Sequence, residues 1–241
     1  DNTAPLTKNK IEDVITWMII GTILGGRLGY VLFYQFDAFL LDPLRIIRFW
    51  EGGMSFHGGF IGVITAALLY CRKTKSNPWS VGDLIASSSC FGLFFGRIAN
   101  FVNAELWGRP TDAPWGIAFP TEVAQNCGQA LGEICARHPS QLYEATLEGI
   151  ILFIVMTYLI FRRNWFKVPG QIIGVFFIGY GLARVLVAGY MHADLQFISI
   201  DNPFGYIIRL NEFGLTMGQT LSLPMVFIGM AIIYMARRRA K

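Results

Sequence analysis

The stretch Leu84–Gly108, LIASSSCFGLFFGRIANFVNAELWG, runs from an apolar segment into a group of polar side chains. Its apolar part, Leu84–Phe101, is long enough to cross a bilayer as a helix, which takes about 17–25 residues. Arg97 lies near the end of this part, and two asparagines and a glutamate follow it. An ionisable side chain inside a bilayer costs about 2.5–3.5 kcal/mol on insertion scales, so an arginine retained there faces a partner, a water-filled cavity or a charged ligand.

The composition is that of a membrane protein. Hydrophobic residues make up 54% of the 241 residues and charged residues only 15%, whereas about 25% of the residues of a soluble domain are charged. Neither a long polar linker nor a fixed-period repeat divides the chain, which predicts one all-α polytopic membrane helix bundle over residues 1–241. Six apolar runs are the candidate spanning helices: Val14–Tyr34, Met54–Tyr70, Leu84–Phe101, Leu142–Phe161, Gln171–Tyr190 and Leu221–Met235.

Basic residues gather at every second junction between these runs. Because Lys and Arg in short loops stay on the cytoplasmic side, both ends of the chain are expected inside and three loops outside. The net charge of +4 reflects this sidedness and gives no reason to expect nucleic-acid binding. The residues concerned are Lys8, Lys10, Arg72, Lys73, Lys75, Arg162, Arg163, Lys167, Arg237, Arg238, Arg239 and Lys241.

The longest outward loop, residues 103–141, contains several prolines, and we expect it to form a small irregular cap on the outer, periplasmic side. Cys127 and Cys135 lie in this loop, but their spacing alone does not show whether they meet the geometry of a disulfide. The cysteines lack metal-ligand spacing, so no metal site is predicted. The chain begins at Asp1 without a signal-peptide pattern, and a further, seventh helix upstream is expected to be missing from it.

Glycines recur at four-residue spacing in the first two runs. Gly21, Gly25 and Gly29 lie in the first run, and Gly58 and Gly62 lie in the second. Small residues at this spacing let two helix backbones approach closely inside a membrane. These helices are therefore predicted to pack tightly.

Three basic residues lie inside the apolar runs: Arg27, Arg97 and Arg184. Each falls in the outer half of a run that is directed outward, so all three are expected at similar depth near the outer leaflet. For any one of them the alternative is an arginine that snorkels to the interface or pairs with a glutamate. Three at one depth favour a cationic chamber, and guanidinium groups match phosphate oxygens through paired donors. A lipid phosphate is the anion available at that depth.

His57 stands at the outer start of the second run, in the glycine-rich motif GGMSFHGG at residues 52–59. A lone histidine is often a satisfied structural residue. Beside the arginines, an imidazole at this position is also suited to accept or donate a proton near neutral pH.

Two glutamates enter the fourth run. Glu144 ends the motif RHPSQLYE at residues 137–144, and Glu148 lies one helical turn further along. Both are candidate partners for the arginines, with orientation of a cation favoured over direct chemistry. Tyr180 and Arg184 are four residues apart and are expected to share one helix face.

At these motifs the chain closely resembles the bacterial prolipoprotein diacylglyceryl transferases. Residues 96–108 fit that family's signature of Gly-Arg, Asn-Phe, Asn, Glu and Gly, and residues 52–59, 137–144 and 178–184 resemble its other motifs. The resemblance implies an enzyme of the bacterial cytoplasmic (inner) membrane that moves the diacylglyceryl group of phosphatidylglycerol onto the lipobox cysteine of a preprolipoprotein and releases glycerol phosphate. The implied partners are phosphatidylglycerol, the preprolipoprotein signal peptide and membrane lipids. No metal and no organic cofactor is implied.

On this resemblance, Arg97 and Arg184 are expected to hold the lipid phosphate, and His57 to accept the proton of the thiol. The other expected site residues position the head group, support the arginines or shape the chamber: Asn100, Asn103, Glu105, Gly108, Tyr180, Arg27 and Glu144.

Two features depart from the family pattern. The family has a glutamate and an arginine where this chain has Ala188 and Met191, so the support of Arg184 must come from elsewhere. The family also begins with an extra span that carries a functional tyrosine and is absent from this chain. The alternative from another class is an anion or lipid transporter with an arginine-lined cavity, and a third is a non-catalytic lipid-binding scaffold. The absence of an inverted repeat speaks against the transporter.

Overall fold

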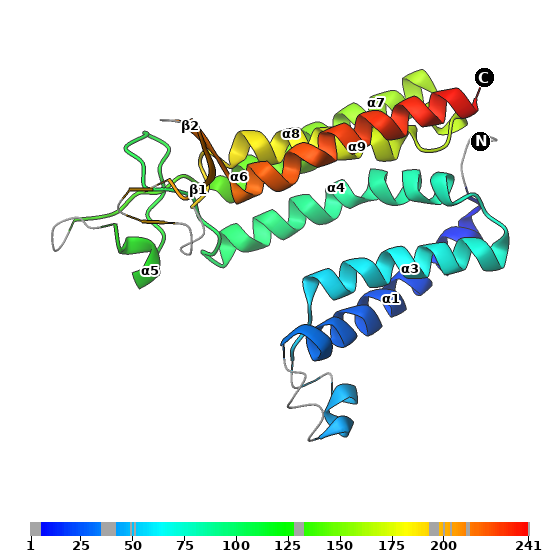
Figure 1. The fold of residues 1–241 in the computed structure, drawn as a ribbon, viewed down its shortest axis with the longest axis horizontal. Helices are drawn as coiled ribbons and strands as arrows, with labels where there is room; N and C mark the ends of the chain where they lie inside the picture. The colour runs from blue at the N-terminus through cyan, green and yellow to red at the C-terminus, as the bar shows by residue number, and fades with distance from the viewer. Residues whose placement is uncertain are drawn as a thin grey trace. The chain divides into compact units, whose positions relative to one another are not determined.

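The computed structural model describes residues 6–34, 42–48, 50, 52–127, 133–192, 198–199, 201–202, 204–210 and 213–240. It is mostly helical, and it divides into two compact units, Asp1–Leu84 and Ile85–Lys241 (Figure 1). In chain order the elements are α1 (Lys8–Tyr34), η1 (Pro43–Ile47), α3 (Phe56–Thr74), α4 (Pro78–Val102), α5 (Glu122–Gln125), α6 (Ser140–Glu144), the π-helix η3 (Ala145–Ile151), α7 (Leu152–Arg163), η4 (Trp165–Lys167), α8 (Gln171–Val187), β1 (Tyr206–Leu210), β2 (Phe213–Thr216) and α9 (Met217–Arg239).

In the first unit, α1 packs along α3 through the glycines that recur at four-residue spacing in the two helices (Figure 1). A Cβ built on Gly25 would collide with the backbone of Gly58 and Gly62, so the two backbones are in contact there. Ser55 caps the start of helix α3, because its side-chain oxygen accepts a hydrogen bond from the amide of Gly58 at 3.2 Å. The predicted close packing of these two helices is confirmed.

In the second unit, α8 runs alongside α9, and α7 continues the helix formed by α6 and η3 (Figure 1). A Cβ on Gly174 would collide with the carbonyl oxygen of Gly229, which places the backbones of α8 and α9 in contact. Thr216 and Gln219 form a capping box that starts α9. The apolar core comprises Ala86, Cys90, Leu152, Met156 and Ile172.

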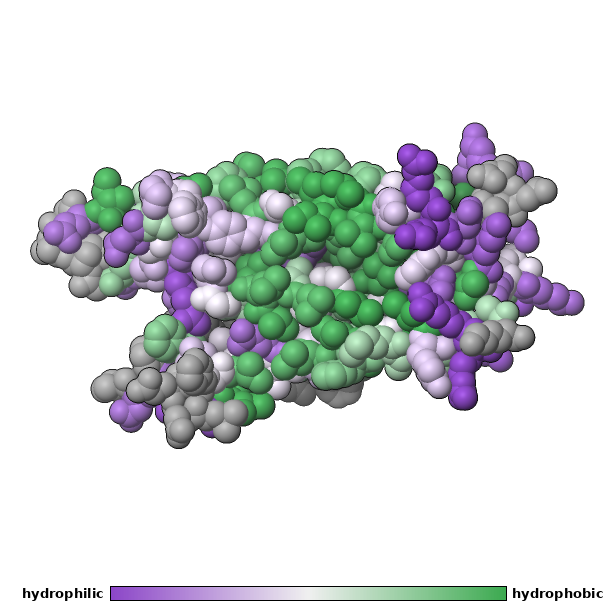
Figure 2. All heavy atoms as spheres, turned by 90° about the horizontal axis from the view of Figure 1, so that it is seen from above, coloured by the Kyte–Doolittle hydropathy of each residue, from purple (hydrophilic) through white to green (hydrophobic). Residues whose placement is uncertain are grey.

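Four of the described helices are long and apolar enough to cross a membrane: Lys8–Phe33, Pro78–Val102, Ser140–Arg163 and Met217–Arg239. They correspond to the first, third, fourth and sixth predicted runs. The second and fifth runs are also helical, as α3 with 19 residues and α8 with 17, but they are not in this set. Figure 2 shows hydrophobic side chains gathered over the middle of the helices and hydrophilic ones at their ends, as in a multi-pass membrane protein.

The expectation of an all-α fold is wrong for the segment that precedes α9. Strands β1 and β2 pair as an antiparallel hairpin, in which Ile208 lies opposite Leu215 and Arg209 opposite Gly214. Residues 206–210 combine an aromatic with β-branched side chains, which favours a strand. The hairpin leads directly into the capping box of α9.

The described parts of residues 103–139 are largely irregular, as the prolines predict, apart from the short helix α5. Cys127 and Cys135, whose pairing the sequence left open, form a disulfide with Cα atoms 6.1 Å apart. The buried guanidinium of Arg137 donates to the backbone carbonyls of Ala124, Asn126 and Gly108 and lies 4.0 Å from the ring centroid of Trp107. The Cys127–Cys135 disulfide and the buried guanidinium of Arg137 therefore both stabilise residues 103–139, the irregular segment.

Candidate active site

Four charged side chains from three helical segments meet in the second unit. Arg97 comes from α4, Glu144 ends α6, Glu148 lies in the π-helix η3, and Arg184 comes from α8. These four residues form the Arg–Glu cluster. The prediction that the glutamates are partners of the arginines is confirmed.

Glu144 joins the two arginines of the cluster. Its Oε1 lies 3.3 Å from Nη2 of Arg97, and it also accepts a hydrogen bond from Nη1 of Arg184. Oε2 of Glu148 lies 3.9 Å from Nε of Arg97, and its Oε1 lies 4.0 Å from Nη1 of Arg184. Arg184, which lacks an acidic residue at Ala188, is thus supported from the neighbouring helix.

Local backbone features bring these side chains together. Gly149 packs directly on α4, because a Cβ built there would lie 2.7 Å from the Cβ of Phe94. Arg97 follows Phe94 by one helical turn and so lies on the same face of α4. The π-helix begins immediately after Glu144 and contains Glu148, and such π-turns are frequent at functional sites.

The cluster is buried on its acidic side and partly open on its basic side. The side chains of Glu144 and Glu148 are 0% exposed, whereas those of Arg97 and Arg184 are 19% and 18% exposed. Oε2 of Glu144 and both oxygens of Glu148 have no hydrogen-bond partner among the described residues. Two carboxylates balance two guanidinium groups, while the basic groups still present donors that an anion can reach.

Tyr180 lies one turn before Arg184 on α8, as the spacing predicts. Its ring stacks on Phe176 at a centroid distance of 5.8 Å. The predicted role of Tyr180 in shaping the chamber stays a prediction.

The three polar residues of the opening motif lie in the last turn of α4 (Asn100) and in the turn that follows it (Asn103 and Glu105). Oε1 of Glu105 accepts hydrogen bonds from the side-chain amides of Asn100 at 2.8 Å and Asn103 at 3.4 Å. The backbone carbonyl of Glu105 accepts from Gln141 at 2.6 Å, and the carbonyl of Leu106 accepts from the Ser140 hydroxyl at 3.1 Å. The turn is thus fastened to the start of α6, the helix that carries Glu144. Direct positioning of Arg97 by Glu105 stays a prediction.

Gly108 occupies a position where a side chain has no room. A Cβ there would collide with the carbonyl oxygens of Tyr190 and His138, and its amide donates to the His138 carbonyl at 2.8 Å. The contact of Gly108 with the substrate stays a prediction.

Arg27 and His57 lie in the first unit, so their placement relative to the Arg–Glu cluster stays a prediction. Arg27 is 2% exposed and donates to the carbonyls of Gly52, of Gly53 at 3.1 Å, of Ile46 at 2.9 Å and of Arg48 at 3.0 Å. These contacts show Arg27 holding the backbone that precedes α3. His57 is exposed in the first turn of α3.

The site residues expected from the sequence did not include Glu148, although Glu148 was predicted to be a partner for one of the arginines. A second glutamate inside an apolar run, one turn after Glu144, was the available signal. Gln141 was missed as well, because an amide near a helix start has no specific pattern. Among the described residues, no group of three or more His, Cys, Asp or Glu side chains is arranged to hold a metal ion.

A family model described as prolipoprotein diacylglyceryl transferase matches residues 2–235 of the chain. A protein from Cereibacter sphaeroides named phosphatidylglycerol–prolipoprotein diacylglyceryl transferase is 54% identical over 236 residues, which cover 98% of this chain and 80% of that protein. Proteins of the same name from Ruegeria pomeroyi and Rhizobium leguminosarum are 50% and 45% identical, cover 98% and 99% of this chain, and match over 80% and 78% of their own length.

Proposed function

The chain belongs to the prolipoprotein diacylglyceryl transferase family, and on this premise we propose that it performs the first step of lipoprotein maturation. It transfers the diacylglyceryl group of phosphatidylglycerol to the lipobox cysteine thiol of a preprolipoprotein. A new bond forms between the cysteine sulfur and the glycerol carbon, and the bond between that carbon and the phosphate oxygen breaks. Glycerol phosphate leaves with the electron pair of the broken bond.

The observation that carries the proposal is the pair of guanidinium groups in the Arg–Glu cluster. Arg97 and Arg184 share Glu144 as a partner and are each about one fifth exposed. Negative charge grows on the phosphate oxygen as the carbon–oxygen bond breaks. Donors already oriented towards that oxygen stabilise the transition state more than the ground state.

The buried carboxylates fix the arginines before the lipid enters. An arginine has a long flexible side chain, and Glu144 and Glu148 restrain both guanidinium groups from the buried side. The phosphate then binds from the open side. Tyr180, Asn100, Asn103 and Glu105 shape the surroundings of the head group in this proposal.

The nucleophile is the cysteine thiolate, so the reaction needs an acceptor for the thiol proton. His57 fills this role in the proposal, because an imidazole exchanges protons near neutral pH. A His57→Gln enzyme with an unchanged pH–rate profile would argue against it.

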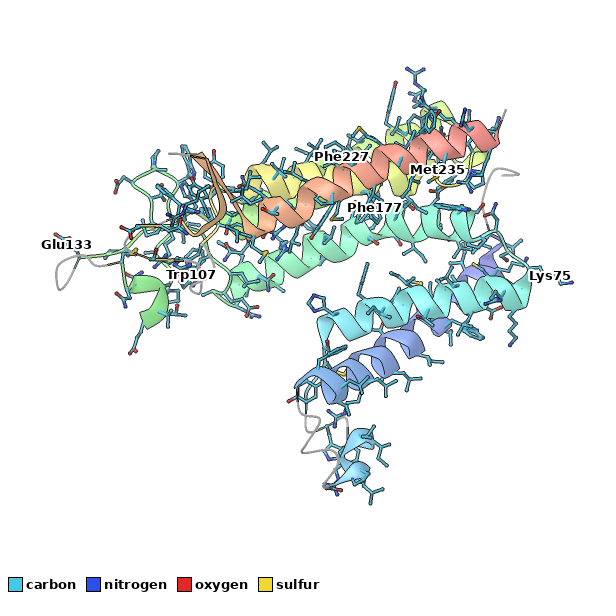
Figure 3. The ribbon with its side chains drawn as sticks, in the orientation of Figure 1. Lys75, Trp107, Glu133, Phe177, Phe227 and Met235 are labelled. Carbon is cyan, nitrogen blue, oxygen red and sulfur yellow. A yellow bond between two sulfur atoms is a disulfide. The ribbon has the colours of Figure 1, made fainter. Side chains whose placement is uncertain are left out.

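We propose a bacterial inner-membrane protein with six spans, in which α3 and α8 cross with the four longer helices. The irregular segment forms a periplasmic cap, and its disulfide suits an oxidising compartment. Trp107 in this segment and Met235 near the basic end of α9 lie at opposite ends of the second unit (Figure 3). This separation agrees with basic residues inside and the cap outside.

The test is an in vitro transfer assay with phosphatidylglycerol and a lipobox peptide, using Arg97→Ala and Arg184→Ala. We expect almost complete loss of product in both, since each removes a donor from the developing phosphate charge. Arg163→Ala, at the end of α7, is the matched control and is expected to retain activity. Near-normal product from either cluster variant would overturn the phosphate-binding role.

A further inference from the structure

The helices that carry Glu144 and Arg184 also line a cavity of about 410 Å³, and none of the four residues of the Arg–Glu cluster is among its described lining residues. Pockets that bind small molecules have volumes of about 300–1,000 Å³. Among the described residues, the lining contains no Asp, Glu, Lys or Arg side chain. Its walls come from α6, η3, the end of α8 and the irregular segment, and they include Trp115, His138, Tyr143, Leu147, Leu186 and Tyr190.

The cavity changes character along the helix axes. Tyr143 lies in the first helical turn after Ser140, and Tyr190 follows the end of α8, so both aromatic rings lie at the same end of the helices. Leu147 and Leu186 each lie one turn further into the apolar part of these helices. Aromatic side chains concentrate where lipid head groups meet hydrocarbon. The cavity therefore runs from an interfacial aromatic end to an aliphatic end.

A chain of hydrogen bonds leaves one donor at the aromatic end. The indole Nε1–H of Trp115 donates to the hydroxyl of Tyr143 at 2.8 Å, and that hydroxyl lies 3.1 Å from Nδ1 of His138. Since the Tyr143 hydroxyl accepts from Trp115, its own proton can be donated to Nδ1 of His138. We assign the bond in this direction, which places the ring proton of neutral His138 on Nε2. Burial lowers the pKa of His138, which favours the neutral ring. Nε2 has no hydrogen-bond partner among the described residues.

We propose that this cavity binds the ester end of one acyl chain of a glycerolipid. The Nε2–H of His138 donates to the ester carbonyl, and the chain passes between Leu147 and Leu186. A phosphate fits this lining poorly, because its charge would have no cationic partner among the described lining residues. An ester carbonyl requires one neutral donor, and ester groups of lipids lie at the depth of the aromatic end. The inference deepens the proposed function, on which it rests for the identity of the lipid head group.

The experiment uses the full chain in lipid nanodiscs with a photoreactive glycerolipid that carries a diazirine near the ester. One probe has a phosphatidylglycerol head group and the other a phosphatidylcholine head group. After irradiation, mass spectrometry locates the labelled residues. We expect labelling of residues around the cavity. Labelling by both probes indicates a subsite that recognises the acyl ester alone, and labelling by the phosphatidylglycerol probe alone indicates the lipid substrate; both support the proposal.

Leu186→Trp is designed to fill the cavity. Leu182→Trp is its matched control, because Leu182 lies one turn earlier on α8, does not line the cavity and is 48% exposed, compared with 64% for Leu186. We expect Leu186→Trp to remove most of the labelling and Leu182→Trp to leave it unchanged. His138→Phe keeps an aromatic ring without a donor and should weaken probe binding about twofold to tenfold, whereas His138→Gln should restore part of it.

Labelling that is absent from the cavity, or that persists in Leu186→Trp, would overturn the proposal. Labelling of the same residues by a photoreactive lipobox peptide, with no labelling by either lipid, would assign the cavity to the protein substrate instead. Because labelling requires no turnover, the two proposals fail separately. A chain without transfer activity that still labels at the cavity contradicts the proposed function alone.

Discussion

The chain uses buried arginines in two different ways, shown by the Arg–Glu cluster and by the pair Arg27 and Arg137. Arg27 and Arg137 are each 2% exposed and donate to backbone carbonyls. Arg97 and Arg184 retain exposed surface and pair with carboxylates from a neighbouring helix. A guanidinium enclosed by carbonyls stabilises the backbone around it, whereas one held from a single side can still bind an anion. The partners of an arginine, more than its presence in an apolar run, distinguish the two roles.

The largest expected effect comes from replacing a cluster arginine by lysine. Arg97→Lys and Arg184→Lys keep the charge but lose the planar paired donors, so the transfer rate should fall about 10²–10³-fold. The thermal unfolding temperature should change little. Transfer assays and unfolding of the same preparations test this, with Arg163→Lys as control. Near-wild-type transfer in either variant would remove the distinction between the two kinds of arginine.

The opposite result is expected for the carbonyl-bound arginines. Arg27→Met and Arg137→Met leave buried carbonyl oxygens without donors, and the free energy of unfolding should fall by about 1–3 kcal/mol. Transfer activity per folded molecule should stay close to that of the wild type. Denaturant unfolding in detergent, combined with activity normalised to folded protein, measures both quantities. A large loss of normalised activity without a loss of stability would place these arginines in the site.

A smaller effect is expected for Glu148→Gln, which keeps the shape of the side chain and removes its negative charge. The cluster then becomes more positive, so the KM for phosphatidylglycerol should fall about threefold to tenfold. The kcat should also fall, because the arginines are less firmly oriented. Glu122→Gln, an exposed change in α5, is the control. A lower kcat with an unchanged KM would indicate loss of active protein and not a change in the site.

The smallest expected effect is a pH dependence of stability at His138. Burial lowers the pKa of this imidazole in the folded state, so the unfolded state binds more protons once the pH falls below about 6.5. Stability is therefore complete above that pH and decreases below it, by at most about 1.4 kcal/mol per pH unit. Unfolding temperatures between pH 8 and pH 5 test this, and His138→Gln should reduce the slope. An equal slope in both proteins would contradict the prediction.

The apolar runs predicted the positions of the membrane helices because a bilayer requires long uninterrupted apolar segments. The ends of the helices were harder to predict from the sequence. Helix α4 begins at Pro78 and not at Leu84, and α9 extends from Met217 to Arg239, well beyond the predicted Leu221–Met235. These ends depend on local hydrogen bonds, such as the capping box of Thr216 and Gln219, which hydropathy does not measure.

Among the site residues, Arg97, Arg184 and Glu144 were predicted from their chemistry and from the family motifs, and the structure brings them together. Arg27 has the same residue type and a similar position in its run, yet it binds carbonyls. From the sequence one can infer that a buried cation must have partners. The sequence does not show whether another segment will supply carboxylates or backbone carbonyls as those partners.

The sequence by itself determined the membrane class, the apolar runs and the family, because each depends on composition or on residues near one another in the chain. The tertiary structure alone decided which charges pair, through the contact of Gly149 with Phe94 and the π-helix that carries Glu148. It also decided the pairing of Cys127 with Cys135 and the neutral cavity beside His138. These features depend on distances between separate segments, which become defined only when the helices pack.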